Sequence, residues 1–155
     1  MQGKKKEGKM KTKVVIVTGG WDPLHSGHVA YLQSAARLGN FLVAGINSDD
    51  WLTRKKGNYF LPFLERYVIL SNLRMVDRAI GFNDKDETAI DCIRQVRNMF
   101  PEVPIIFANG GDRTSENIPE QVIADELKVK FVFGVGGNTK RNSSSDILNR
   151  WKKEN

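Results

Sequence analysis

Short apolar runs alternate along the chain with longer segments whose apolar residues recur at helical spacing. Five runs predict β-strands, at residues 14–17, 41–46, 78–82, 104–108 and 131–133. Their nearly continuous apolar character is typical of strands that are covered on both faces of a parallel sheet. Helical patterns separate or follow them, at residues 29–38, 62–73, 86–100, 119–127 and from Ser143 onward. The alternation predicts a single Rossmann-like, doubly wound α/β domain with a five-stranded parallel sheet.

Local signals refine these predictions. Asp86 is expected to cap the third helix, and the S-x-x-D pattern at residues 143–146 has the form of a helix start. Residues 51–61 are polar and basic, and they predict an exposed loop. The last helix is expected to pack through three residues, Ile147, Leu148 and Trp151.

The net charge of +6 is concentrated at the amino-terminal end. Residues 1–13 contain six lysines and one glutamate, whereas the remaining chain has 18 basic and 17 acidic residues. We therefore divide the chain into a basic, disordered arm, residues 1–13, and a nearly neutral folded domain, residues 14–155. Such an arm can bind nucleic acid or anionic lipid, but a solvated tail is the simpler interpretation, and no nucleic-acid partner is expected.

A single cysteine, Cys92, lies in a half-apolar helical pattern. It cannot form an internal disulfide, which fits a reducing compartment, and we expect a small buried core residue rather than a catalytic thiol. No apolar run approaches the length of a membrane span, and the lysine-rich start lacks the apolar segment of a signal peptide. The expectation is a cytoplasmic protein with no membrane partner.

The stretch that carries most chemistry connects the first strand to the first helix. It reads Thr18-Gly19-Gly20-Trp21-Asp22-Pro23-Leu24-His25-Ser26-Gly27-His28. Glycines let the backbone approach a phosphate closely, and the free N–H groups at a helix start attract negative charge. His25 and His28 are three residues apart and share one face of the helix start. Two imidazoles and a helix N-terminus directed at one place suit the charge that develops on a phosphate under attack.

Other strand ends bring further polar groups to the same edge of the sheet. Asn47 follows the second strand, Asp112 follows the fourth, and serines 143–145 follow the last glycine turn. No candidate nucleophile stands beside a base, and the histidines lack the cysteine or carboxylate pattern of a zinc site. In-line transfer at phosphorus needs positioning and charge stabilisation rather than covalent help, and this set of groups fits that requirement.

The segment from Gly19 to His28 is similar to the G-x-F-D-x-x-H-x-G-H signature of the cytidylyltransferase-like nucleotidyltransferases. The likeness extends over nearly the whole chain after Lys13, with Lys56-Gly57, Glu65-Arg66 and the serine run in family order. The most similar subgroups are the heptose-phosphate nucleotidyltransferases and the glycerol-3-phosphate cytidylyltransferases. Asn-Ser-Asp at residues 47–49 and Gly-Gly-Asp at residues 110–112 favour the former.

The resemblance implies a reaction in which a sugar or polyol phosphate attacks the α-phosphate of ATP or CTP and releases pyrophosphate. It assigns catalysis to His25 and His28, which stabilise the five-coordinate α-phosphate, and to Lys56, which neutralises charge on the triphosphate. A magnesium ion that bridges the phosphates is the implied cofactor, with few protein ligands. The implied partners are a nucleoside triphosphate, a phosphorylated sugar or polyol and a second copy of the chain. Products of such enzymes feed surface polysaccharide synthesis.

The resemblance also gives a set of nucleotide-binding candidates, with Asp112 near the ribose or the metal and the serines on phosphate. For Asp22, a role in holding the loop or orienting a histidine is as open as direct catalysis. The full set is Gly19, Gly20, Trp21, Asp22, Gly27, Gly111, Asp112, Arg141, Ser143, Ser144 and Ser145.

Two positions depart from the family pattern. Gly20 stands where a threonine or small residue is usual, and Arg141-Asn142 precede the serines in place of a glycine and an apolar or small residue. A glycerol-3-phosphate or other polyol-phosphate cytidylyltransferase therefore stays open as an alternative. A non-catalytic nucleotide-binding regulatory protein is the alternative of another class.

Overall fold

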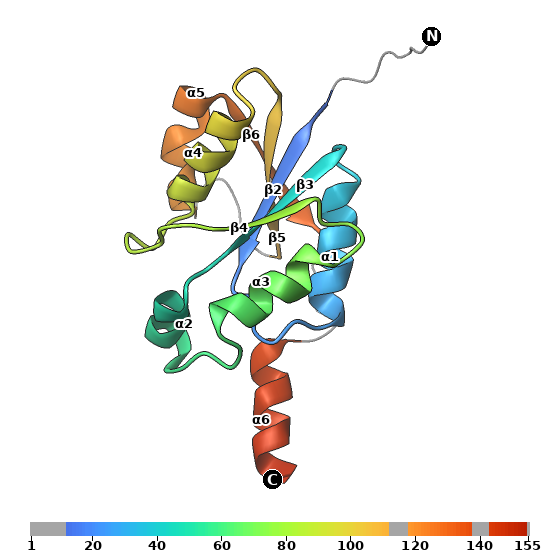
Figure 1. Ribbon diagram of the computed structural model, residues 1–155, viewed down its shortest axis with the longest axis vertical. Coiled ribbons are helices and arrows are strands. Elements are labelled where there is room, and N and C mark those ends of the chain that lie inside the picture. Colours follow the sequence, from blue (N-terminus) through green and yellow to red (C-terminus); the bar gives the residue numbers. More distant parts are fainter. Residues whose placement is uncertain (1–11, 112–117, 138–142, 155) are drawn as a thin grey trace.

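Five parallel strands form one sheet in a computed structural model that describes residues 12–111, 118–137 and 143–154 (Figure 1). Their order across the sheet is β4-β3-β2-β5-β6. The bounds are β2 Val14–Gly19, β3 Phe41–Ile46, β4 Arg78–Gly81, β5 Ile105–Gly110 and β6 Val129–Val135. All four neighbouring pairs are parallel, with Val14 of β2 beside Phe41 on one side and Ile105 on the other. The predicted five-stranded doubly wound fold is confirmed.

Helices cover both faces of this sheet, with α1 and α3 on one face and α4 and α5 on the other (Figure 1). The helices of the described chain are α1 Ser26–Ala36, α2 Asp49–Lys56, α3 Phe63–Ser71, α4 Ile90–Met99, the 3₁₀ helix η1 Pro119–Ile123, α5 Ala124–Leu127 and α6 Ser144–Glu154. Alternate residues of β2 show how the layers form. Val14 and Ile16 join the core cluster beneath α4, which includes Ile93, whereas Val15 and Val17 join the cluster of α1 and α3. The central strand β2 therefore buries both of its faces, which explains its continuous apolar run, whereas the edge strands β4 and β6 are partly exposed.

The expected loop at residues 51–61 is largely wrong, because residues 51–56 belong to α2. The Ser48 side chain caps this helix by accepting a hydrogen bond from the Trp51 N–H, and two acidic residues follow in the first turn. Three basic residues occupy the last turn, and Gly57 ends the helix with a φ of +91°. Charges of this order complement the helix dipole. Only Leu52 is buried, so the helix lacks the apolar periodicity that would have predicted it.

Two expectations about caps have different outcomes. Asp86 does not cap α4, which begins at Ile90 after an Ala89 N-cap; the Asp86 carboxylate instead accepts hydrogen bonds from Thr88 in the preceding turn. The S-x-x-D start of the last helix is confirmed, because the Ser143 hydroxyl accepts a hydrogen bond from the Asp146 N–H at 3.0 Å.

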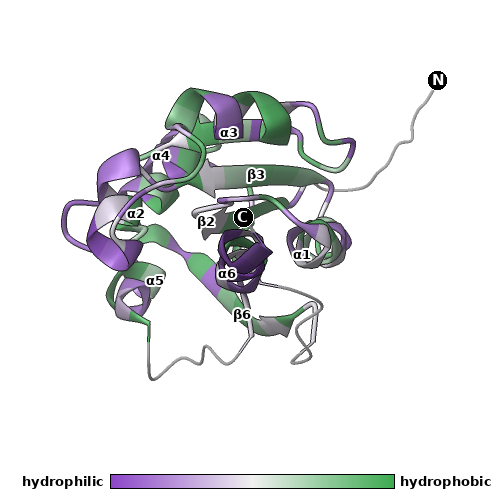
Figure 2. Cartoon of the chain, turned by 90° about the horizontal axis from the view of Figure 1, so that it is seen from below, coloured by the Kyte–Doolittle hydropathy of each residue, from purple (hydrophilic) through white to green (hydrophobic). Residues whose placement is uncertain are grey.

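The last helix, α6, extends away from the carboxyl edge of the sheet (Figure 1). Seen from below, most of the α6 ribbon has the colour of hydrophilic residues (Figure 2). None of its described residues is buried, and the expected packing residue Trp151 is 57% exposed. The described chain has no helix that is long and apolar enough to cross a membrane.

Candidate active site

The loop between β2 and α1 lies at the point where the strand order reverses. The strand β2 lies between β3, which follows it in the chain, and β5, which begins some 90 residues later. In open α/β sheets, ligands bind outside the carboxyl ends of the strands at this reversal. The fold therefore places the loop that contains His25 and His28 at the expected binding crevice.

The two histidines form the amino-terminal cap of α1. His25 is the N-cap residue, and its Nδ1 accepts a hydrogen bond from the Gly27 N–H at 3.0 Å. His28, at the third helical position, returns the interaction, because its Nδ1 accepts from the His25 N–H at 3.2 Å. This reciprocal pattern is a capping box in which imidazoles replace the usual hydroxyl and carboxamide. The rings stack with centroids 3.9 Å apart, which confirms that the histidines share one face.

These hydrogen bonds determine the protonation of both rings. Since each Nδ1 accepts a hydrogen bond, the neutral ring carries its proton on Nε2, which becomes a donor. Burial lowers the pKa of His25. Burial, the neighbouring His25 and the Lys56 ammonium together lower the pKa of His28 to about 4. Both histidines are therefore neutral Nε2–H donors at neutral pH.

The buried Trp21 ring packs against His28, on the side of the core. Its side chain is 3% exposed, its Nε1–H donates to the Gly45 carbonyl at 2.9 Å, and its ring meets His28 edge-on at 5.2 Å. The predicted nucleotide-binding residue Trp21 thus has its ring in the core. Gly20 packs closely against α2, because a Cβ there would lie 2.8 Å from a terminal methyl of Leu52 and would force that side chain to shift.

Asp22 and Lys56 connect the histidine loop to the end of α2. The buried Asp22 carboxylate accepts hydrogen bonds from the Phe60 and Leu61 N–H groups at 2.6 Å each. Lys56 Nζ donates to the Asp22 carbonyl at 2.6 Å and lies 3.4 Å from its carboxylate. Of the two roles left open for Asp22, these contacts support holding the loop. They also bring Lys56 to the histidine loop, as predicted.

The start of α6 reaches the same loop. The Ser144 hydroxyl donates to the Pro23 carbonyl at 2.8 Å, whereas Ser145 is exposed on the first turn. Gly111 is exposed just after β5, with a φ of +63°. The predicted site residues Asp112 and Arg141 lie outside the described residues. The start of α6 and the loop that contains the histidines, more than a hundred residues apart, are therefore in contact.

Sequence reasoning did not predict the structural roles of two buried charged residues in this region, Arg66 and Asp84. Arg66 is buried and pairs with Asp49 at 2.6 Å, and not with its neighbour Glu65. Asp84, also buried, accepts hydrogen bonds from Asn47 and Ser48 at the end of β3. The polar run at residues 47–49 was the available signal, because buried polar groups at a strand end need partners.

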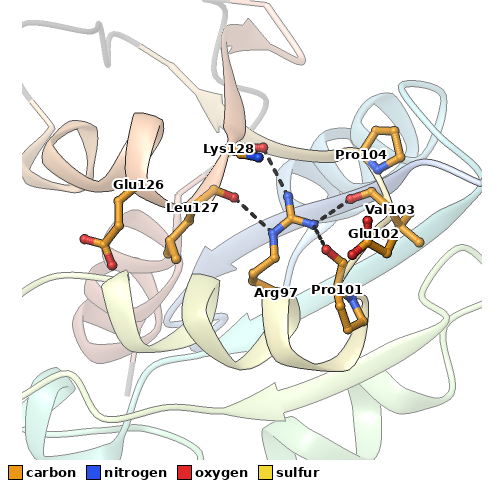
Figure 3. A pocket seen from close by; sticks show the side chains of 8 residues that line it. All are labelled: Arg97, Pro101, Glu102, Val103, Pro104, Glu126, Leu127 and Lys128. Atoms are coloured by element: carbon orange, nitrogen blue, oxygen red, sulfur yellow. Dashed lines mark hydrogen bonds between the residues drawn. The ribbon is translucent and has the colours of Figure 1, made fainter.

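A hollow lies at the opposite edge of the sheet from the histidines, around Arg97 (Figure 3). Its volume is about 420 Å³, and its lining segments at residues 101–104 and 126–128 immediately precede β5 and β6. The Arg97 guanidinium donates to five backbone carbonyls there, so its hydrogen bonds serve to hold helix ends together. This hollow is at the amino ends of the strands, away from the histidines.

The fold and the histidine loop define a Rossmann-like α/β domain with two paired histidines at the carboxyl edge of its sheet. Comparison with known proteins gives the family: residues 16–150 match the cytidylyltransferase-like family, and the chain belongs to it. The resemblance seen in the sequence is thereby confirmed.

Individual relatives agree with this family. The chain is 34% identical over 143 residues to the bifunctional protein HldE of Syntrophotalea carbinolica, covering 90% of this chain and 28% of the relative. It is 36% identical over 126 residues to the protein of the same name from Aliarcobacter butzleri, covering 79% of this chain and 25% of the relative. The chain thus spans less than a third of the length of these relatives.

Solved structures share the fold. A lipopolysaccharide core biosynthesis protein from Thermoplasma volcanium superposes with a TM-score of 0.61 and 25% identity, covering 84% of this chain and 99% of that one. A putative nicotinate-nucleotide adenylyltransferase from Vibrio parahaemolyticus gives 0.59 and 17% identity, covering 94% of this chain and 89% of that one.

Proposed function

We propose that this chain transfers a nucleoside monophosphate from ATP or CTP to a sugar phosphate of the heptose-phosphate type, with release of pyrophosphate. The observation that carries the proposal is the pair of neutral imidazoles, each with Nδ1 engaged by a backbone N–H of the helix cap. Family membership supports the reaction class. Similarity to the HldE proteins and to a lipopolysaccharide core biosynthesis protein supports a sugar-phosphate acceptor.

The arrangement suits in-line attack on an α-phosphate. An acceptor phosphate oxygen bonds to the α-phosphorus while the bond from that phosphorus to the bridging oxygen breaks, and pyrophosphate leaves. Negative charge spreads over the α-phosphate oxygens as the five-coordinate state forms. The Nε2–H groups of His25 and His28, together with the positive end of α1, would stabilise that charge, and the Lys56 ammonium would neutralise charge on the triphosphate.

The donor set also suits a magnesium ion held mainly by the triphosphate. Both Asp22 oxygens accept backbone hydrogen bonds, and the described part of the chain has no cluster of three or more metal-binding side chains. Mg²⁺ keeps most of its water and needs few protein ligands, and it would neutralise phosphate charge. A second copy of the chain remains part of the proposal, from the family resemblance alone.

The direct test is pyrophosphate release, measured with ATP or CTP and Mg²⁺ against a panel of heptose phosphates, other sugar phosphates and glycerol 3-phosphate. We expect turnover with a sugar phosphate, and His28→Ala should lower it by about a hundredfold, the scale of one lost transition-state donor. Arg94→Lys, on the far helix α4, should leave turnover unchanged. Nucleotide binding without turnover on any acceptor would instead favour a regulatory protein, and turnover only with glycerol 3-phosphate would favour a polyol-phosphate cytidylyltransferase.

A further inference from the structure

Three arginines of the described chain form ion pairs with carboxylates, and Arg66 is the one of these whose side chain is completely buried. It extends from α3 to the carboxyl edge of the sheet, where it contacts three separate backbone segments. Nη1 donates to the carbonyls of Gly20 and Asn47 at 2.8 and 2.7 Å, and Nε donates to the Leu61 carbonyl at 2.9 Å. Nη2 completes the set with Asp49 Oδ1 at 2.6 Å.

Burial of a guanidinium is costly unless its charge is paired and its N–H groups are satisfied. Asp49 supplies the opposite charge, and its side chain remains 32% exposed. A lysine cannot replace this set, because its single ammonium lacks the planar fork that reaches several acceptors at once. An apolar residue would fill the volume but leave three carbonyls without their donor. The hydrogen bonds of Arg66 therefore hold three backbone segments in fixed positions, in addition to filling the volume between them.

The three carbonyls belong to the segments that surround the histidines. Gly20 lies two residues before Asp22 in the histidine loop, and Leu61 ends the short connection that follows Lys56. Asp22 ties the same connection to the loop through the N–H groups of Phe60 and Leu61. Arg66 and Asp22 thus act as two parallel links between the loop and the segment behind Lys56.

We propose that Arg66 is a positioning residue that fixes Lys56 relative to the paired histidines. This inference rests on the proposed nucleotidyl transfer for its effect on turnover. Arg66 contacts backbone and Asp49 but no group that the proposal places on the substrate. Its loss lets the two sides of the site move apart, and a misplacement of about 1 Å can cost about a hundredfold in rate.

The first test compares Arg66→Lys with the matched substitution Arg94→Lys on the surface of α4, both assayed well below their unfolding temperatures. Arg66→Lys should lower kcat by about tenfold or more, with a change of less than about threefold in the KM for the triphosphate, because the transition state is affected most. In a Lys56→Ala background the same substitution should have less than about a threefold effect. If Arg66→Lys does not fold, Asp49→Asn, which keeps an acceptor at a partly exposed position, takes its place.

The second test needs no substrate. Acetic anhydride labels lysines, and mass spectrometry gives the rate for Lys56 relative to Lys55, its exposed neighbour in α2. In Arg66→Lys or Asp49→Asn this ratio should rise at least about twofold, because Lys56 loses its fixed position against Asp22. An unchanged labelling ratio would overturn the positioning role. So would a loss of kcat on Arg66→Lys that is equally large in the Lys56→Ala background. If the wild-type protein shows no turnover, the proposed function fails, whereas the labelling ratio still decides the role of Arg66.

Discussion

The neutral state of His28 makes a prediction about stability that needs no substrate. Its pKa is lowered from 6.5 to about 4 in the folded protein. Between these values the unfolded chain binds a proton that the folded chain does not, so the unfolded state is favoured as the pH falls. The stability that depends on a neutral His28 is fully present above pH 6.5 and is lost progressively toward pH 4.

The magnitude follows from the same two pKa values. A pH of 5 is about 1.5 units below the pKa of the histidine in the unfolded chain. Each unit corresponds to about 1.4 kcal/mol, so the free energy of unfolding falls by about 2 kcal/mol. His28→Gln is the matched control, because glutamine does not titrate and can still accept the capping hydrogen bond at the third helical position.

The assay is urea unfolding of both proteins at pH 8 and pH 5. The wild-type protein should lose about 2 kcal/mol more than His28→Gln over this interval. The contributions of His25 and of the carboxylates are common to both proteins and cancel to a first approximation. Equal losses in the two proteins would mean that His28 takes up a proton as readily in the folded state as in the unfolded one. The conclusion that burial and the Lys56 ammonium oppose protonation of folded His28 would then be refuted.

Three further predictions concern packing. Gly20→Ala should lower the free energy of unfolding, measured with urea, by about 1–3 kcal/mol, because its Cβ would lie 2.8 Å from Leu52. The double variant with Leu52→Ala should lose less than the sum of the two single changes, because the contact is then relieved. Arg97→Met should cost about 2–3 kcal/mol by calorimetry or urea, with kcat unchanged, because backbone carbonyls at two helix ends lose their donor. Cys92 is completely buried, and burial raises the pKa of its thiol, so a thiol reagent should label it only as fast as the protein unfolds; rapid labelling of the native protein would contradict this placement.

The sequence predicted the layers of this fold better than its connections. The central strands could be predicted because both of their faces are buried, and Val14 to Val17 show this in four consecutive apolar residues. Helix α2 could not, because its stability comes from the Ser48 cap, end charges and one buried leucine, none of which produces an apolar period. The η1–α5 segment was predicted as one helix, but its first turn is 3₁₀. Hydrogen bonding distinguishes these forms, and residue spacing does not.

In the candidate site, too, some features could be predicted from the sequence and others could not. The histidines and the serine run could be placed at one edge because parallel strands share a carboxyl edge, and the family resemblance added Lys56. Most partners of Asp22 and Arg66 could not be predicted, since they are backbone groups that lie 5 to 46 residues away. A carboxylate or guanidinium that binds backbone leaves no residue-type signal at the partner position.

The capping box also explains why the helix start and the proposed chemistry depend on one protonation state. A protonated His28 would carry a proton on Nδ1, which could no longer accept the hydrogen bond from the His25 N–H. Protonation would thus break the cap at the same moment that it places a positive charge beside Lys56 and His25. The cap, the burial against Trp21 and the neighbouring ammonium all oppose that proton. Because the same contacts leave the remaining proton on Nε2, the interactions that begin the helix also fix the tautomer that the proposed stabilisation of phosphate charge requires.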